Sequence, residues 1–207
     1  MFYKMMVILL CSCTYLSANS FHIKVLSGDE IIPHTEEIVK ICGAIYREYP
    51  YLYNGDDAGY EEYLESYCKV KGAIVCLAFD TDKVIGLATG MPMQETREIY
   101  QQTFLKNGYD LESLYYLGEF GVQKEYQGRG VEEALYAEIA AVAQDRSKKL
   151  CLWELSSDLP RGYIPNSTFW EKIGFIHHPE LYFTIVWTNI GDAIESEHLA
   201  EYWVVTF

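Results

Sequence analysis

The chain has 207 residues, half of them hydrophobic, which is enough to bury the core of one domain. Its formal net charge is −14 at pH 7. This charge argues against a nucleic acid or an anionic membrane as partner, because both bind basic surfaces. It suits a cationic or amine-bearing ligand, although many acidic soluble proteins carry a similar charge without one.

The first 20 residues hold an apolar run followed by small and polar residues, as in a signal peptide. The run is too short to predict an integral membrane span. Two other interpretations stay open: a start site placed too early, with Met5 or Met6 as the true start, and an extra N-terminal strand. We therefore expect one domain at residues 21–207, preceded by a segment 1–20 that is a signal peptide or a misplaced start.

The six cysteines show no repeated pair at the spacing of metal ligands, so we expect free thiols and no metal site. They are Cys11, Cys13, Cys42, Cys68, Cys76 and Cys151.

Strands and helices alternate over the first half of the domain, as their apolar spacing indicates. The predicted elements are a strand at 21–26, a helix at 36–46, a tyrosine-rich loop at 46–57, an acidic helix at 60–69, strands at 73–79 and 83–90, and a polar segment, helical in part, at 94–113. Asp80, Thr81 and Asp82 join the last two of these strands and have the length and residue types of a hairpin turn.

Residues 115–135, YYLGEFGVQKEYQGRGVEEAL, form the central motif. A buried strand ends at Val122, a polar turn follows, and residues 127–130 lead directly into a helix. Free backbone amides and the positive end of the helix dipole bind anions at such a place, and glycines let the ligand come close. The motif therefore predicts a site for a cofactor that carries a pyrophosphate.

The second half continues the same alternation around a mixed sheet, which gives an α/β or α+β fold. The predicted elements are a helix from Val131 to about Lys149, a strand at 150–155, a loop at 158–165, a short helix at 166–173 that Gly174 ends, and closing strands at 181–187 and 202–207.

This order of elements, together with two motifs, resembles the GNAT superfamily of acetyl-CoA dependent N-acetyltransferases over residues 21–207. One motif is Gln-x-x-Gly-x-Gly/Ala, matched by Gln127, Gly130 and the position of Glu132; the other is the segment from Asn166 through FWEKIGF to Phe175. The segments REYPYLY, YYLGE and STFWEKIGF also resemble a bacterial subgroup without an assigned substrate. The resemblance implies a mainly antiparallel mixed sheet with helices on both faces, acetyl-CoA as cosubstrate and a primary amine, small molecule or peptide, as acceptor.

The resemblance also implies where the cofactor lies. Loop amides would hold the pyrophosphate, and the pantetheine would pair with the strand that ends at Val122. The residues expected at the cofactor are Phe120, Gly121, Val122, Gln127, Gly128, Arg129, Gly130, Val131, Glu132, Asn166 and Trp170.

Amine acetylation needs a base, since an ammonium with a pKa of about 10.4 is protonated at neutral pH. Glu119 occupies the position where related enzymes place a glutamate base, and on a strand it shares a face with Gly121. Glu154 is the second candidate base, although it could instead pair with Arg161. Trp170 stands where the family usually has a tyrosine acid, so the thiolate leaves unassisted or another tyrosine serves, Tyr163 or Tyr182.

Glu132 departs from the family pattern, which has glycine or alanine there because the cofactor passes close. A carboxylate pointing into the loop would weaken cofactor binding, and one pointing away would only stabilise the helix start. The alternative function is therefore a catalytically weakened GNAT-fold binding or regulatory module. We expect a cytoplasmic protein, because acetyl-CoA is intracellular, with export as the alternative. The strands from Leu181 onward could form a homodimer edge.

Overall fold

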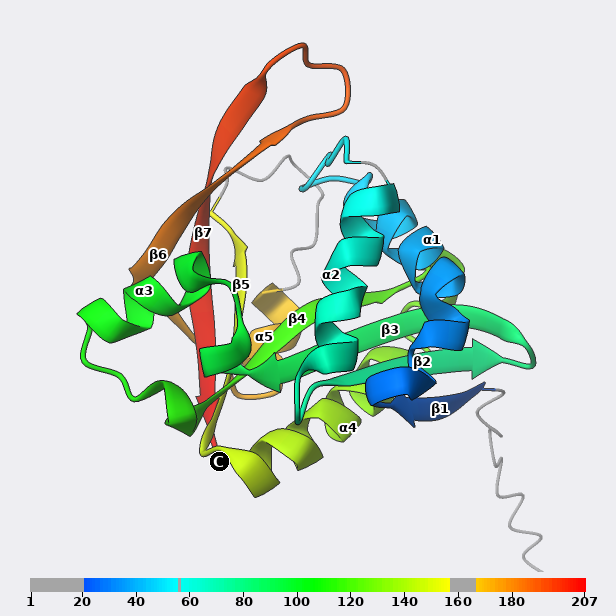
Figure 1. The fold of residues 1–207 in the computed structure, drawn as a ribbon, viewed down its shortest axis with the longest axis horizontal. Coiled ribbons are helices and arrows are strands. Elements are labelled where there is room, and N and C mark those ends of the chain that lie inside the picture. The colour runs from blue at the N-terminus through cyan, green and yellow to red at the C-terminus, as the bar shows by residue number, and fades with distance from the viewer. Residues whose placement is uncertain (1–20, 56, 157–166) are drawn as a thin grey trace, which may run out of the picture.

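The computed structural model describes residues 21–55, 57–156 and 167–207, and it shows one seven-stranded sheet with the order β1-β2-β3-β4-β5-β7-β6 (Figure 1). The strands are β1 (Phe21–Leu26), β2 (Ile74–Asp80), β3 (Lys83–Pro92), β4 (Leu114–Val122), β5 (Lys149–Leu155), β6 (Ile176–Thr188) and β7 (Glu195–Thr206). Of the neighbouring pairs, β4 and β5 are parallel and the others antiparallel. The predicted mixed, mainly antiparallel sheet is confirmed.

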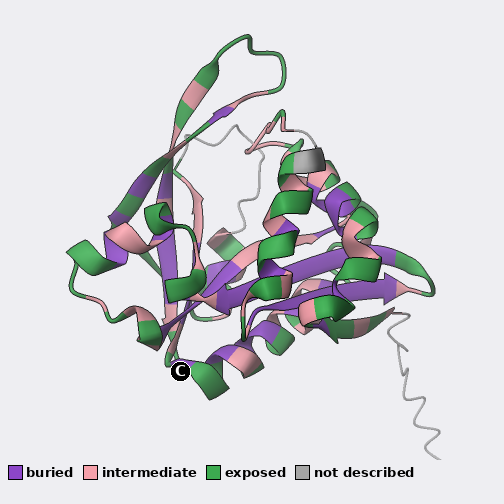
Figure 2. Cartoon of the chain, in the orientation of Figure 1, coloured by how far each residue is buried: buried purple, intermediate pink, exposed green. Residues whose placement is uncertain are grey.

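Helices cover both faces of the sheet, as predicted. The helices are α1 (Thr35–Tyr46), α2 (Asp57–Lys69), α3 (Glu98–Lys106), α4 (Val131–Arg146) and α5 (Ser167–Lys172). One hydrophobic core lies between the sheet and α1, α2 and α3, and the other between the sheet and α4 and α5. The central strands β2 and β3 are buried on both sides along most of their length (Figure 2).

Several predicted boundaries are wrong. The helix after the glycine turn ends at Arg146 rather than near Lys149, because Ser147 is already extended and Lys149 pairs with β7. The closing strands are longer than predicted, since β6 begins at Ile176 and β7 at Glu195. Their added residues are mostly exposed and polar, so the apolar pattern alone did not mark them as strand.

The parallel strands β4 and β5 separate after three residue pairs. Leu114, Tyr115 and Tyr116 pair with Lys149, Leu150 and Cys151, and the pairing stops there although both strands continue. From Leu117 to Val122, β4 pairs with β3 alone. No described strand pairs with this half of β4 on the β5 side, where a strand-like ligand could add, although the Val122 carbonyl at its end accepts a hydrogen bond from the Gln127 side-chain amide at 3.2 Å.

A β-bulge interrupts β4 within this open half. Ala88 pairs with Phe120 and Gly90 with Leu117, so Gly118 and Glu119 together stand opposite Thr89. Leu117 and Phe120 are three residues apart, yet both pack against the α4 side of the sheet. Without the bulge the carboxyl group of Glu119 would share the face of Leu117; the extra residue turns it toward α1 and α2.

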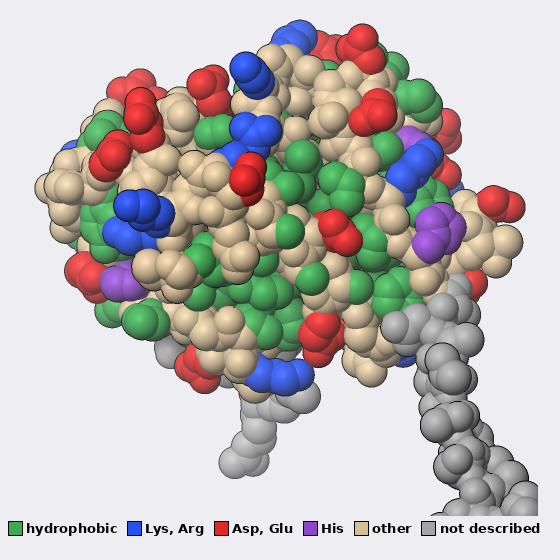
Figure 3. Space-filling model, turned by 90° about the horizontal axis from the view of Figure 1, so that it is seen from below, with side chains coloured by type: hydrophobic (Ala, Val, Ile, Leu, Met, Phe, Trp, Pro, Cys, Tyr) green, Lys and Arg blue, Asp and Glu red, His purple; other side chains and the backbone are tan. Residues whose placement is uncertain are grey.

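The described part of the chain has neither a membrane-spanning helix nor a group of metal ligands. None of its helices combines the length and the hydrophobicity that a membrane crossing requires. No three His, Cys, Asp or Glu side chains between residues 21 and 207, the masked positions aside, are grouped as metal ligands. Cys42, Cys68, Cys76 and Cys151 are free thiols. On the face in Figure 3, acidic and basic side chains are dispersed around apolar ones rather than gathered by charge.

Candidate functional site

Glu119 points into a cluster of tyrosines from α1 and α2. Burial raises the pKa of its carboxyl group above the usual range, and hydrogen bonds from the hydroxyls of Tyr46 and Tyr63 lower it in part. The negative charge of Glu119 in turn contributes to raising the pKa of Tyr46, Tyr60 and Tyr63, after burial. Burial favours the neutral carboxylic acid, while the two hydrogen bonds stabilise the carboxylate. A carboxyl group with these opposing effects is suited to take up a proton.

A chain of hydroxyl groups fixes this carboxyl group from behind. The hydroxyl oxygens of Tyr63 and Tyr67 are 2.9 Å apart, and the hydroxyl of Thr89 donates to that of Tyr67 at 2.9 Å. The backbone N–H of Glu119 donates to the Thr89 hydroxyl at 2.8 Å, which satisfies a group that the bulge removes from the ladder. Together with the hydrogen bond from Tyr63 to the Glu119 carboxyl, these hydrogen bonds lead back to the Glu119 backbone N–H and form a closed ring.

Close packing leaves no room for side chains next to this ring. A Cβ atom at Gly118 would lie 2.8 Å from the Thr89 hydroxyl and 2.9 Å from that of Tyr63. A Cβ atom at Gly121 would collide with Ile45 of α1. The two glycines of the motif LGEFG thus let α1 and α2 approach the strand on either side of Glu119.

A cavity of about 180 Å³ lies beside the ring, where β4 leaves β5. Its walls come from α2, from the end of β3 and the turn after it, from α3 and from β4. The lining residues are Tyr63, Ser66, Met91, Glu95, Thr96, Arg97, Tyr100 and Tyr116. Tyr63 belongs both to this cavity and to the ring around Glu119, so the cavity and the carboxyl group share a wall.

The loop at residues 127–130 has the backbone of an anion-binding turn. Gly128 and Gly130 adopt positive φ angles of 69° and 85°, and α4 begins directly afterwards with Gly130 as its N-cap residue. No side chain caps the helix from Gly130, so backbone amides of the first turn remain directed at the loop.

The Glu132 side chain turns back into this loop. Its Oε1 accepts a hydrogen bond from the N–H of Gly128 at 3.3 Å, and its Oε2 is buried without a hydrogen-bond partner among the described residues. A carboxylate therefore occupies part of the cradle that an incoming phosphate would use. The orientation that we expected to weaken anion binding is the one observed.

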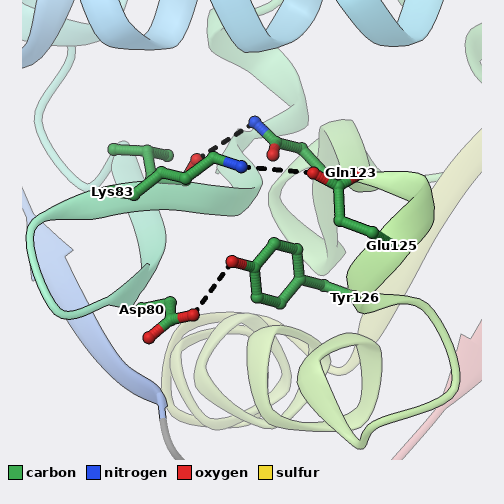
Figure 4. Close-up of polar contacts among 6 residues, drawn as sticks. Asp80, Lys83, Gln123, Glu125 and Tyr126 are labelled. Atoms are coloured by element: carbon green, nitrogen blue, oxygen red, sulfur yellow. Dashed lines mark hydrogen bonds and ion pairs between the residues drawn. The ribbon is translucent and has the colours of Figure 1, made fainter.

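The β2–β3 hairpin holds the loop in place (Figure 4). The Gln123 side-chain amide donates to the Val84 carbonyl at 3.2 Å, and Lys83 pairs with Glu125 at 3.2 Å. The hydroxyl of Tyr126 donates to Asp80 at 2.9 Å. The guanidinium of Arg129 lies 5.0 Å from the centre of the Tyr126 ring. The basic side chain next to the cradle is thus stacked on an anchored ring.

Glu154, the second candidate base, lies on the opposite face of the sheet from Glu119. Its Oε1 accepts a hydrogen bond from the indole N–H of Trp170 at 2.7 Å. Trp170 is buried and packs against Phe120 and Phe175, on the α4 side. The structure brings Phe120, Trp170 and Glu154 together, away from the tyrosine ring. Tyr182 is more than half exposed on β6, and Tyr163, Arg161 and Asn166 lie outside the described residues.

Sequence reasoning missed the residues that surround Glu119. From the sequence, the tyrosines at residues 46–57 are predicted to lie in a loop, and neither they nor those of α2 have a predicted role. Tyr60, Tyr63 and Tyr67 recur at helical spacing and so share one face of α2, which is a signal that could have found them. No local pattern pairs that face with Glu119, because the bulge decides which way its side chain points.

The family model described as the Acetyltransferase (GNAT) family matches residues 39–175. Three solved structures illustrate the likeness. Arabidopsis thaliana NAA60 in complex with acetyl-CoA is 14% identical with a TM-score of 0.62, over 90% of this chain and 98% of that chain. The ribosomal-protein-alanine N-acetyltransferase of Brucella melitensis is 15% identical with a TM-score of 0.61, over 90% and 99%. A GNAT acetyltransferase of Streptococcus pneumoniae is 15% identical with a TM-score of 0.56, over 90% and 99%.

The search of curated proteins gives no match. The solved structures are too distant in sequence to show more than the fold. The family model covers residues 39–175, well over half of the 207 residues, and the same fold extends over nine-tenths of the chain. The chain therefore belongs to the acetyltransferase (GNAT) family.

Proposed function

We propose that the protein transfers an acetyl group from acetyl-CoA to a primary amine, with Glu119 as the general base. The observation that carries the proposal is the placement of Glu119, a carboxyl group of raised pKa, on the bulged and open half of β4, beside a cavity. A related fold, that of Arabidopsis NAA60, has been solved with acetyl-CoA, which supports the same cosubstrate here.

The backbone of the loop fits a pyrophosphate, whereas the carboxylate of Glu132 beside it would repel one. Two glycines of positive φ and the start of α4 supply amides, and the free edge of β4 can pair with a pantetheine amide. The carboxylate of Glu132 lies among those amides and must turn outward. Lys124 and Arg129 are exposed nearby and can offset its charge.

Acetyl-CoA would supply a thioester-activated acetyl group: the amine nitrogen bonds to its carbonyl carbon, the C–S bond breaks, and coenzyme A leaves as a thiolate. Glu119 takes the proton that the acceptor ammonium must lose, directly or through water. Tyr46 and Tyr63 donate hydrogen bonds to the carboxylate and so hold its oxygen atoms in place. The raised pKa of Glu119 narrows its difference from that of an ammonium, which makes proton transfer less unfavourable than it would be to an ordinary carboxylate.

Calorimetric titration with acetyl-CoA and a thiol-release assay over a panel of amines test this function. The proposal expects measurable cofactor binding and acetylation of at least one amine, with the acetylated product confirmed by mass spectrometry. If no binding is detected at millimolar acetyl-CoA, the proposed acetyltransferase activity is refuted.

A second function is favoured by one observation, the carboxylate of Glu132 in the anion cradle. A GNAT-fold protein that has lost cofactor affinity would serve as a binding or regulatory module. Absence of cofactor binding by the wild-type protein, together with binding by Glu132→Gly, would favour this function.

A further inference from the structure

We infer that the cavity beside Glu119 binds the acceptor, and that Arg97 selects small acceptors which carry a carboxylate beside their amine, such as free amino acids with apolar side chains. The inference rests on the proposed acetyl transfer, and it assigns a substrate class and a specificity residue to the same site.

The position of the cavity suits an acceptor. It is lined by Tyr116, the last β4 residue that pairs with β5, and it lies on the sheet face to which the Glu119 side chain points. Tyr63 lines the cavity, and its hydroxyl is hydrogen-bonded to the Glu119 carboxyl. The charge of Glu119 also acts on Tyr100 and Tyr116, which line the cavity. Tyr63 thus connects an amine in the cavity with the group that must receive its proton.

The size and lining of the cavity limit the acceptor. Its volume of about 180 Å³ is below the range of roughly 300–1,000 Å³ found for pockets that hold drug-sized ligands. Tyr63, Tyr100, Tyr116 and Met91 make its walls largely aromatic and apolar. Such a space accepts a small molecule with an apolar side chain rather than a folded protein surface.

Arg97 is the cation of the cavity. Its side chain is exposed, and its guanidinium group is hydrogen-bonded to the hydroxyl of Tyr100 on the next turn of the chain. No ion pair within the described residues includes Arg97, although carboxylates far outnumber basic groups in the sequence. The guanidinium is therefore oriented by a tyrosine, and its charge is left for a ligand. Arginine binds carboxylates with paired hydrogen bonds in a fixed plane.

Glu95 lies on the same cavity, two residues before Arg97. Glu95 and Arg97 thus place on one wall the two charges that attract the ammonium and the carboxylate of an entering amino acid, whose amine must then reach Glu119. An amine without a carboxylate would leave Arg97 without a partner, a preference that the net charge of the protein alone does not predict.

Matched acceptors test the inference. Leucine, methionine and phenylalanine are each compared with their amides and with the corresponding amines that lack the carboxyl group, in the thiol-release assay with acetyl-CoA. The decisive quantity is the ratio of kcat/KM for acid over amide, compared between variants, because this cancels differences in amine reactivity. Replacing Arg97 by Met should lower the ratio about ten- to a hundredfold, the worth of a hydrogen-bonded charge.

Three controls accompany this comparison. Arg97→Lys should retain part of the preference, since it keeps the charge and loses the planar fork. Lys106→Met removes a positive charge at the far end of α3 and should leave the ratio unchanged. Cofactor affinity should be equal in all variants. A wild-type enzyme that acetylates amides and simple amines as well as the acids would overturn the assignment of Arg97 while leaving acetyl transfer intact.

A binding measurement separates this inference from the proposed function. Calorimetry with the same acids in the presence of coenzyme A requires no turnover. If the acids bind to the wild type and more weakly to Arg97→Met, yet are not acetylated, this result supports the cavity assignment and refutes the proposed acetyltransferase activity. An absence of both binding and turnover for every acid would refute the cavity assignment.

Discussion

Glu119 lies on a partly exposed strand segment, yet burial among tyrosines raises the pKa of its carboxyl group. Tyr46 and Tyr63 act in the opposite direction, because their hydroxyls donate to the ionised form. The base is active only when ionised, so the rate should fall as the pH decreases through this raised pKa.

Tyr63→Phe should therefore move the acidic limb of the pH profile of kcat/KM to higher pH. The substitution removes a donor that stabilises the carboxylate, and the pKa of Glu119 rises further. Tyr126→Phe removes a hydroxyl at the hairpin contact instead and should leave the limb in place. A limb that shifts to lower pH in Tyr63→Phe, or does not shift, would contradict this role.

Glu132 is the residue most directly opposed to cofactor binding. Glu132→Gly removes a carboxylate from the anion cradle, and we expect the Kd for acetyl-CoA to fall about tenfold or more, a difference of roughly 1.4 kcal/mol or more. Calorimetry gives this value, with Glu132→Gln as the control that removes the charge and keeps the shape. An unchanged or weaker affinity in Glu132→Gly would show that the carboxylate does not limit binding.

The sequence predicts more about the role of Glu119 than about that of Glu132. The resemblance to the family predicts Glu119, three residues before Val122, as the candidate base. The tyrosines that hold it come from residues 46–67, far away in the chain, and only packing of α1 and α2 on the sheet brings them there. The two orientations of Glu132 were equally compatible with the sequence, and the hydrogen bond from Gly128 decides between them.

At the scale of elements, the β-bulge is the feature that turns β4 into a site. It directs both Gly118 and Glu119 toward α2, and Thr89 replaces the missing ladder partner of the Glu119 N–H. A period of two along YYLGEFGV contains no sign of the extra residue, so the alternation was predicted and the bulge was not. The two glycines are the local sequence signal of the bulge, since glycine in a strand interior often marks a bulge or a close approach of another chain segment.

Gly118→Ala should destabilise the fold by about 1–3 kcal/mol and lower the rate of acetyl transfer, because the new methyl group would displace the buried hydroxyls of Tyr67 and Thr89. Gly43→Ala is the matched control. Gly43 lies within α1 with no atom near its added Cβ, so the same substitution should stabilise by about 0.5–1 kcal/mol. Denaturant unfolding measures both. A stable, fully active Gly118→Ala would mean that the hydroxyl ring is not closely packed or not needed.

At the scale of the whole molecule, the sheet separates two tasks. The α4 side carries the glycine loop, Trp170 and Glu154, and the α1–α2 side carries Glu119 and the cavity. The segment from Tyr46 to Asn54 also docks on the long β6–β7 hairpin, where Asn54 N–H donates to the Thr188 carbonyl at 3.0 Å. The indole N–H of Trp187 reaches the Tyr51 carbonyl at 3.1 Å. The C-terminal strands thus support the segment that follows Tyr46, the last residue of α1.

Fold and site differ in what the sequence could predict. Apolar spacing and the order of motifs were sufficient for the element order and the mixed sheet, because each element buries its own apolar face. The separation of β4 from β5 and the docking of residues 46–54 depend on pairings between distant segments. The homodimer edge, the cytoplasmic location with export as its alternative, and the absence of a nucleic-acid partner stay predictions.

Single-turnover acetyl transfer to the best amine of the panel, compared between Glu119→Gln and Glu154→Gln, tests the central claim most directly. With Glu119 as general base, Glu119→Gln should lower the rate at least about a hundredfold while its Kd for acetyl-CoA stays within about twofold of wild type. Glu154→Gln, on the other face of the sheet, should keep most of the rate. Full activity in Glu119→Gln, or loss of activity in Glu154→Gln alone, would contradict the assignment of the base.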